Sequence, residues 1–252
     1  MMRYVLGSRA SIGGVLGSGR GGGGNGLLTG LVAYWGLDEA SGNALDKHSG
    51  GLTLTQSGNP GADTGKVYAT ARTFNGSSQY FSRNSEAALQ TGNIDFAIAA
   101  WVYLPSVTGD NKPIVYKGGT SSAIDYYLDY SVYVARFRLV VTANGSTEAW
   151  VAADTFGAAS SNTWYFVAGW HDAVANTLNI AINGGAADSA AHSTGVYAGT
   201  GAFAIGKIQA YNKFLSGRIG PVAFWKNRTL DATARAALYN GGAGLAYSAF
   251  TA

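Results

Sequence analysis

Hydrophobic and polar positions alternate with a period of two along much of this chain, and the alternation is clearest in residues 95–103. Phe96, Ile98 and Val102 fall on one face of this stretch, and Trp101 falls on the other face among alanines. An extended strand with two apolar faces is typical of the middle of a packed sheet. The pattern therefore predicts a central strand that other parts of the chain cover on both sides.

The same alternation predicts further short strands, separated by turns rich in glycine and asparagine. We expect these strands over residues 31–35, 52–56, 67–74, 79–82, 113–117, 124–130, 132–141, 147–152, 163–171, 177–183 and 216–227. Turns at residues 75–78, 144–145 and 183–185 are typical of β-hairpins. In the stretch 132–141, Tyr133 and Phe137 are expected on the same, apolar face. Short strands joined by glycine turns indicate an all-β, two-sheet antiparallel sandwich.

The end of the chain has a different pattern. Gly220-Pro221 interrupts the last strand, and because proline cannot donate to a sheet ladder, it predicts a bulge or an edge position. Asp231 is suited to cap a short helix over residues 232–239, which Gly241-Gly242 would end. We expect one short C-terminal helix in an otherwise β structure.

Composition agrees with a single all-β domain of 252 residues, since the chain has 37 glycines, 15 tyrosines and 6 tryptophans but only 12% charged residues. It has no cysteine, so disulfides and thiol chemistry are excluded. No run of about 18 apolar residues occurs, so we expect no membrane span. Glycines and Arg9 interrupt the first apolar residues, so we expect no cleaved signal peptide.

Residues 1–29 form a glycine-rich arm that is basic, whereas residues 30–252 hold 14 basic and 14 acidic residues and form one neutral domain. The arm predicts either a flexible linker or an assembly element that neighbouring subunits hold by strand addition. Its candidate assembly residues are Arg3, Tyr4, Arg9 and Arg20. Three arginines are too few to indicate nucleic-acid binding.

Several motifs occur in order along residues 31–244. They are Leu31-Val-Ala-Tyr-Trp35 with Asp38-Glu-Ala-Ser-Gly-Asn43, Phe74-Asn-Gly-Ser-Ser78, Phe96-Ala-Ile-Ala-Ala-Trp-Val102, Thr163-Trp-Tyr-Phe-Val-Ala168, residues 178–184, Gly217-Arg-Ile219 and Thr229-Leu-Asp-Ala-Thr-Ala-Arg-Ala-Ala-Leu-Tyr239. With these motifs the chain resembles the laminin-G-like, concanavalin A-like jelly-roll family, in particular its bacterial and phage branch. The resemblance implies a jelly roll of two antiparallel sheets with adjacent first and last strands. Gly220-Pro221 stands where family members often carry acidic residues, so a binding role at that position is not carried over.

The family includes glycosidases, which need two catalytic carboxylates. The only glutamates are Glu39, Glu86 and Glu148, and none lies in the Glu-x-Asp-x-x-Glu strand pattern of family hydrolases. Asp125 and Asp129 share a strand face, but we expect them to be solvated hairpin residues. We therefore expect no enzyme, and a glycosidase is the alternative only if two carboxylates face each other across a groove.

The three histidines, His48, His171 and His192, have no metal-ligand spacing, and His171 is expected to be a hydrogen-bonded structural residue.

Calcium is a possible ligand because many laminin-G-like domains bind it, although no cofactor is required. Asp38, Asn43 and Asp46 lie in one loop and offer the oxygen atoms that calcium prefers. The same residues are also common as plain turn formers. Calcium binding at these three residues is an expectation of the sequence.

Aromatic side chains near loops could stack on sugar rings, and the candidates are Trp150, Tyr197 and Tyr211. The first functional hypothesis is a non-catalytic structural or adhesive protein of a phage virion, such as a decoration, fibre or tail protein. Its arm would join subunits of a homo-oligomer. The alternative hypothesis is a carbohydrate-binding module of a bacterial surface or secreted protein. Neither hypothesis involves nucleic acid or a membrane.

Overall fold

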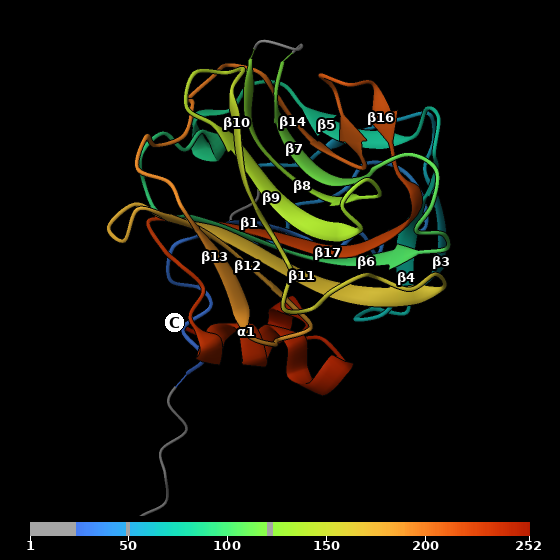
Figure 1. Cartoon of the computed structure of the whole chain (residues 1–252). Helices are drawn as coiled ribbons and strands as arrows, with labels where there is room; N and C mark the ends of the chain where they lie inside the picture. Colours follow the sequence, from blue (N-terminus) through green and yellow to red (C-terminus); the bar gives the residue numbers. More distant parts are fainter. Residues whose placement is uncertain (1–23, 49–50, 120–122) are drawn as a thin grey trace, which may run out of the picture.

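The computed structural model describes residues 24–48, 51–119 and 123–252, which form two antiparallel sheets packed face to face (Figure 1). The eight-stranded sheet runs in the order β13 (Ala187–Ala191), β12 (Thr177–Ile182), β11 (Thr163–Asp172), β6 (Phe96–Leu104), β17 (Ser216–Lys226), β4 (Thr70–Asn75) and β3 (Gly61–Thr64). Its eighth strand, β1 (Leu31–Trp35), also pairs with β17. The seven-stranded sheet runs in the order β10 (Glu148–Ala152), β9 (Arg136–Thr142), β8 (Ile124–Ser131), β7 (Lys112–Gly118), β14 (Ala202–Ile205), β5 (Tyr80–Arg83), β2 (Thr55–Ser57). A separate hairpin consists of β15 (Lys207–Ile208) and β16 (Lys213–Phe214). The predicted fold class is confirmed.

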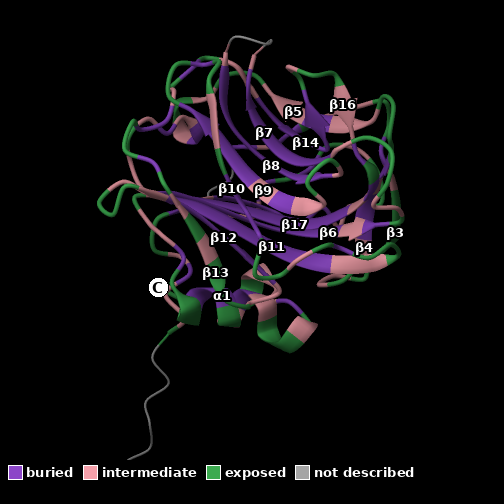
Figure 2. Ribbon diagram, viewed as in Figure 1, coloured by how far each residue is buried: buried purple, intermediate pink, exposed green. Residues whose placement is uncertain are grey.

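Strand β6 lies in the middle of the eight-stranded sheet, between β11 and β17. Phe96, Ile98 and Val102 are fully buried in the core between the two sheets. Trp101 points to the opposite face, where a second buried cluster forms. Figure 2 shows that buried residues fill the strands of both sheets, while exposed residues gather in the loops. The prediction of a strand covered on both sides is therefore confirmed.

The second cluster lies on the outer face of the eight-stranded sheet, and helix α1 (Ala232–Tyr239) covers part of it. Asp231 caps the helix because its side chain accepts a hydrogen bond from the backbone N–H of Ala234 at 2.7 Å. Asn240 adopts a left-handed conformation with φ of 48° and ends the helix just before the predicted glycines. The described part of the chain also has three short 3₁₀ helices, η1 (Ala87–Leu89), η2 (Asn240–Gly242) and η3 (Tyr247–Ala249). The predicted helix is confirmed at both ends.

The first and last strands of the sandwich are neighbours, as the family resemblance implies. β1 pairs with the second half of β17, with Leu31 opposite Trp225, and β4 pairs with its first half. The register between β17 and β6 shifts after Ile219, so Gly220-Pro221 forms a bulge. The alternative of an edge position is wrong, because β17 has partners on both sides.

The strand predicted over residues 132–141 begins only at Arg136. Residues 132–135 form a turn in which Ala135 has a φ of 54°. Tyr133 is therefore 81% exposed, whereas Phe137 is fully buried as expected. The alternation continues into the turn by chance, so the pattern alone could not show where the strand begins.

The turn at residues 75–78 does not form the predicted hairpin. β4 and β5 flank it, but they belong to different sheets, so this turn carries the chain from one layer to the other. The side-chain oxygen of Asn75 accepts backbone N–H groups of Ser77 and Ser78, both at 3.0 Å. A local asparagine turn looks the same in either setting, which explains the error. The hairpins at residues 144–145 and 183–185 are confirmed.

Strands β3, β13, β14, β15 and β16 have no counterpart among the predicted ones. They are two to five residues long and are mostly made of alanine, glycine and polar residues. Such short stretches give period-two analysis too few positions, and pairing with neighbouring strands completes their extended shape.

Residues 24–29 lie against the sandwich, beside the last residues of the chain. The backbone N–H of Asn25 donates to Oγ1 of Thr251 at 2.6 Å, and Oδ1 of Asn25 accepts the backbone N–H of Thr251 at 2.9 Å. Leu27 is fully buried in the cluster on the outer face of the eight-stranded sheet. Its carbonyl accepts the indole N–H of Trp225 at 2.8 Å. We call Asn25, Leu27 and Thr251 the terminal clasp.

The remaining arm, with Arg3, Tyr4, Arg9 and Arg20, lies outside the described residues. Within the described ranges, no helix has the length and apolar character needed to cross a membrane.

Candidate functional site

The outer face of the seven-stranded sheet carries polar and aromatic side chains instead of a covering helix. On β8, Tyr126 and Leu128 point into the core, so the alternating residues between and beside them point outward. The same alternation directs polar and aromatic side chains of β9 and β10 outward. Together these outward residues are Asp125, Tyr127, Asp129, Arg138, Glu148 and Trp150.

The β15–β16 hairpin lies across this face. Ile208 of the hairpin packs against Tyr116 of β7 and Tyr127 of β8 in a small apolar cluster. The hairpin thereby divides the face into two parts. On the side of β8, β9 and β10 is a hollow of about 450 Å³, which we call the first hollow. Its lining residues are Asn111, Tyr127, Asp129, Tyr133, Arg138, Glu148, Ile208, Tyr211 and Lys213.

A buried ion pair forms the floor of the first hollow. Arg138 binds Asp129 through two hydrogen bonds, Nε to Oδ1 at 3.1 Å and Nη2 to Oδ2 at 2.8 Å. Burial raises the pKa of Asp129 above its ordinary value, and the hydrogen bonds from Arg138 oppose that shift. The guanidinium also lies 5.9 Å from the ring centre of Trp150, so it supports the indole from one side. The floor is therefore polar, internally neutral and fixed in position.

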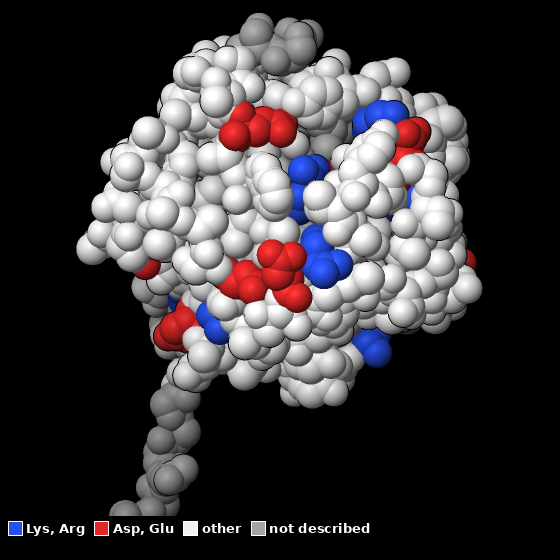
Figure 3. All heavy atoms as spheres, in the orientation of Figure 1, with Lys and Arg blue, Asp and Glu red and all other residues white. Residues whose placement is uncertain are grey.

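Glu148 ties the hairpin to the edge of the sheet. Its Oε1 accepts the hydroxyl hydrogens of Tyr127 at 2.8 Å and Tyr211 at 2.7 Å. Burial, followed by the hydrogen bond to Glu148, raises the pKa of Tyr211 to about 12. Lys213 extends from the same hairpin and pairs with Asp110 at 2.6 Å. In the view of Figure 3, acidic and basic groups likewise lie beside one another on a largely uncharged surface.

Three aromatic side chains are exposed at or beside the first hollow. Trp150 is 46% exposed, Tyr211 is 47% exposed and Tyr133 is 81% exposed. Exposed rings beside fixed hydrogen-bonding groups can receive the apolar face of a sugar while polar groups bind its hydroxyls. Of the three predicted stacking residues, Tyr211 lines the first hollow, and Trp150 lies beside it, next to Arg138 of the floor. Tyr133 was missed because its alternating context made it look like a core residue.

The third predicted stacking residue, Tyr197, lies elsewhere. It is half-buried, and its backbone N–H donates to the carbonyl of Thr142 at 2.6 Å. Its ring packs close to Gly199. Tyr197 does not line the first hollow.

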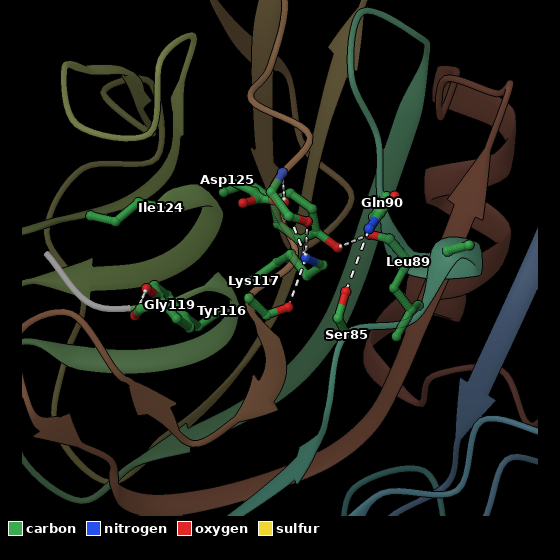
Figure 4. Close-up of polar contacts among 12 residues, drawn as sticks. Ser85, Leu89, Gln90, Tyr116, Lys117, Gly119, Ile124 and Asp125 are labelled. Atoms are coloured by element: carbon green, nitrogen blue, oxygen red, sulfur yellow. Dashed lines mark hydrogen bonds and ion pairs between the residues drawn. The ribbon is translucent and has the colours of Figure 1, made fainter. Parts of the chain in front are cut away.

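Asp125 and Asp129 are not the solvated hairpin residues that the sequence suggested, because both are fully buried. Asp125 pairs with Lys117, whose Nζ lies 3.1 Å from Oδ2 (Figure 4). The same Nζ donates to the carbonyls of Gly199 at 2.9 Å and Gly201 at 2.8 Å. Burial raises the pKa of Asp125 in spite of the lysine beside it. The cations that pair with these two buried carboxylates come from neighbouring strands. The spacing of the two aspartates along one strand therefore could not reveal the pairing.

The residues of the predicted calcium site have other partners. Asp38 pairs with Lys47 at 2.7 Å, and the side chain of Asn43 accepts the backbone N–H of Gln56 at 3.1 Å. Asp46 accepts backbone N–H groups of Tyr34 and His48 through Oδ1. Among the described residues, no group of three or more His, Cys, Asp or Glu side chains is placed to hold a metal ion. Lys47 is thus the cationic partner of Asp38 in this structure, and calcium binding at these three residues stays a prediction.

His171 is a structural residue, as predicted. It is fully buried in β11, and its Nδ1 donates to the carbonyl of Ile94 at 2.8 Å. Burial lowers its pKa, so the neutral form is favoured.

Comparison with solved structures supports the architecture. A domain of an extracellular arabinanase from Geobacillus stearothermophilus, solved in complex with arabinotriose, has a TM-score of 0.61 and 17% identity, over 85% of this chain and 98% of that one. The binding domain of Paraclostridial Mosquitocidal Protein 1 has a TM-score of 0.67 and 14% identity, over 86% of this chain and 53% of that one. A botulinum neurotoxin type C structure, described with cell entry dependent upon two ganglioside molecules, has a TM-score of 0.59 and 12% identity, over 84% and 51%. The chain thus spans about half the length of the two toxin structures. At these identities the likeness concerns the fold.

No curated protein matches the chain. A sequence model of the laminin G type, described as the concanavalin A-like lectin/glucanases superfamily, matches residues 75–234. That region includes β6, most of both sheets and the first hollow. The match covers more than half of the chain, and it agrees with the two-sheet architecture: the chain belongs to the concanavalin A-like lectin/glucanases superfamily.

Proposed function

We propose that this protein is a non-catalytic carbohydrate-binding domain and that the first hollow is its glycan site. The observation that carries the proposal is the fixed Arg138–Asp129 floor, with exposed Tyr211 lining the first hollow and exposed Trp150 beside it, next to Arg138. Sugars present both apolar ring faces and hydroxyl groups, and the first hollow offers a partner for each. Because the floor is held by internal bonds, little ordering entropy remains to be lost on binding.

The same contacts argue against catalysis. Asp129 and Glu148 share the first hollow, which is the arrangement that a glycosidase would need. Asp129, however, is held in a two-point pair with Arg138, and Glu148 accepts two tyrosine hydroxyls. A nucleophile or general acid must reach the substrate, and these carboxylates are directed at protein partners. We expect no hydrolysis of any glycan that binds.

The ligands named for structurally similar domains support the proposal that this protein binds a glycan. The arabinanase domain was solved with arabinotriose, and the botulinum neurotoxin type C structure is described with gangliosides. Arabinotriose and ganglioside oligosaccharides are therefore the first probes to use. We expect the location to be extracellular, at a cell surface or on a virion, where such glycans are accessible.

A second candidate is display on a particle, such as a phage virion, with the glycine-rich arm as the anchor. The terminal clasp favours it, because Leu27 lies on the outer face of the eight-stranded sheet and the first hollow lies on the outer face of the other sheet. The arm thus joins the domain on the side opposite the proposed glycan site. An anchored domain of this kind would present the first hollow outward.

Calorimetry and a glycan array can test the glycan site. Trp150→Ala should lower the affinity for a bound glycan about tenfold, the loss expected for one stacking contact. Trp164→Ala is the matched control, because Trp164 is a half-buried tryptophan on the opposite sheet. Equal losses in both variants, or no binding across neutral and sialylated glycans, would refute the proposal. Because the carboxylates of the predicted calcium loop are internally bonded, chelation of calcium should leave the affinity unchanged.

Light scattering and electron microscopy can test display. The full chain should form oligomers or bind particles, whereas a chain beginning at Gly24, which retains the terminal clasp, should be a folded monomer. Identical monomeric behaviour of both proteins would remove the assembly role of the arm.

A further inference from the structure

A second hollow lies on the other side of the β15–β16 hairpin, over β7, β14 and β5. Its volume is about 300 Å³. Tyr80, Ser82 and Asn84 line it from β5 and the following loop, and Gln209 lines it from the hairpin turn. The floor includes Ala202 and Ala204 of β14, whose small side chains leave room above the sheet. Ser82 and Asn84 also border a neighbouring depression of about 490 Å³, so the space continues toward the edge strand β2.

The chemistry of this second hollow differs from that of the first. Of the described residues that line it, none is acidic or basic. Among the described residues, the side chains of Tyr80, Ser82, Asn84 and Gln209 have no hydrogen-bonding partner in the protein, unlike the paired groups of the first hollow. Two amides and two hydroxyls are thus available, and they offer both donors and acceptors.

The charged groups near the second hollow are already occupied. Lys207 is buried with its Nζ 4.4 Å from the ring centre of Tyr80 and 4.8 Å from that of Phe214. In the neighbouring depression, Arg83 pairs with Glu86 at 2.8 Å. A charged ligand would reach an opposite charge here only by drawing Lys207 away from these rings or by displacing a partner of the Arg83–Glu86 pair. A hydroxyl-rich neutral ligand would gain hydrogen bonds without that cost.

We propose that the second hollow is a separate binding site for an uncharged saccharide. Asn84 and Gln209 bind its hydroxyls from opposite sides, and the ring of Tyr80 borders the site. The protein then binds two sugar units on one face, with the hairpin between them. This inference is independent of the first hollow, because the two sites share no lining residue.

Methyl NMR of the full chain labelled at alanine can test the inference. The probes are three neutral trisaccharides, arabinotriose, maltotriose and galactotriose, and one charged trisaccharide, trigalacturonic acid. At least one neutral probe should shift the methyl signals of Ala202 and Ala204. The double variant Asn84→Ala/Gln209→Ala should weaken that binding about tenfold or more. Trp150→Ala should leave it unchanged, although it should abolish or weaken shifts at the first hollow.

Three results would overturn the inference. The first is that no neutral probe shifts the Ala202 and Ala204 signals, whatever happens at the first hollow. The second is that the shifts keep their midpoint in the double variant while its alanine methyl spectrum shows an intact fold. The third is that trigalacturonic acid binds as tightly as the neutral probes, which would refute the assignment to uncharged sugars. If the first hollow alone fails to bind, only the proposed function fails.

Discussion

The hydroxyl group of Tyr211 lies 2.7 Å from Oε1 of Glu148, and this contact joins the tip of the β15–β16 hairpin to the edge strand β10. Tyr211→Phe removes the bond but keeps the ring. It should reduce glycan affinity at the first hollow severalfold and leave global stability within about 1 kcal/mol, because the side chain is half exposed. Calorimetric titration with thermal unfolding measures both quantities. A full loss of binding would contradict this expectation of a partial, severalfold effect.

Alkaline pH should weaken the folded state. The pKa of Tyr211 is raised to about 12, against an ordinary value near 10, and burial raises that of Tyr127 still further. Between these two pH values the unfolded chain has lost protons that the folded chain retains. Stability from these tyrosines is therefore complete below about pH 10 and is lost as pH rises toward 12. Unfolding temperatures measured from pH 8 to 11.5 should fall, and Tyr127→Phe should make the fall shallower.

The Lys117–Asp125 pair should be costly to break from one side. Lys117→Met leaves a buried carboxylate without its cation and should lower the free energy of unfolding by about 3–5 kcal/mol. The double variant Lys117→Met/Asp125→Asn should be more stable than Lys117→Met alone, because the uncompensated charge is removed. Urea unfolding of Lys117→Met, of Asp125→Asn and of the double variant measures the coupling energy between the two side chains. If the losses in the free energy of unfolding were additive, the two charges would not interact.

The same pair predicts an unusual acid response. Burial raises the pKa of Asp125, and losing Lys117 raises it further. A raised folded pKa gives stability that is present at low pH and lost as pH rises. Lys117→Met should therefore gain stability relative to the wild type when the pH falls from 7 to 4. An unchanged stability difference across this range would contradict the buried carboxylate.

Gly206 should fix the position of the hairpin. It has a φ of 84°, and a side-chain methyl there would lie 2.6 Å from the ring of Phe74. Gly206→Ala should cost about 1–3 kcal/mol and disturb both hollows, because it adds strain and a clash. Gly109→Ala is the control, since Gly109 has a φ of 80° but no neighbour within 4 Å. Equal destabilisation by thermal unfolding would show that strain alone matters.

The terminal clasp should add modest stability. Asn25→Ala removes the side-chain hydrogen bonds to the Ala249–Thr251 region, although the backbone bond of residue 25 remains, and should cost about 1 kcal/mol because the site is exposed. Ser248→Ala is the control, as Ser248 is an exposed residue of the same tail. Limited proteolysis should cut before Leu27 faster in Asn25→Ala than in either the control or the wild type. Equal cleavage rates would show that the clasp does not hold residues 24–29.

Much of the fold could be predicted because it depends on local signals. The two apolar faces of β6 identify a central strand, and Asp231 before an alanine-rich stretch identifies the helix. Strand β14 was not predicted, because Phe203 and Ile205 alternate with alanines over only four residues, and pairing with β5 and β7 completes it. Tyr133 and Asp129 were misplaced for a related reason, since their exposure is decided by a turn and by Arg138 on another strand.

The candidate site was only partly predictable. Trp150 and Tyr211 could be singled out as aromatic residues near loops, but 61 positions separate them in sequence. Their proximity depends on how the hairpin crosses β7, which no local pattern encodes. The polar residues of the floor were even less visible, because a buried charge is recognised only when its partner is known.

The terminal clasp also determines how the domain responds to mechanical load. A pulling force between residue 24 and residue 252 would act first on the short bonds between Asn25 and Thr251 and on the buried Leu27. Because both points of attachment lie side by side, the extension would open the clasp without drawing the two sheets apart. The domain could therefore yield a short length of chain under tension while both hollows keep their shape.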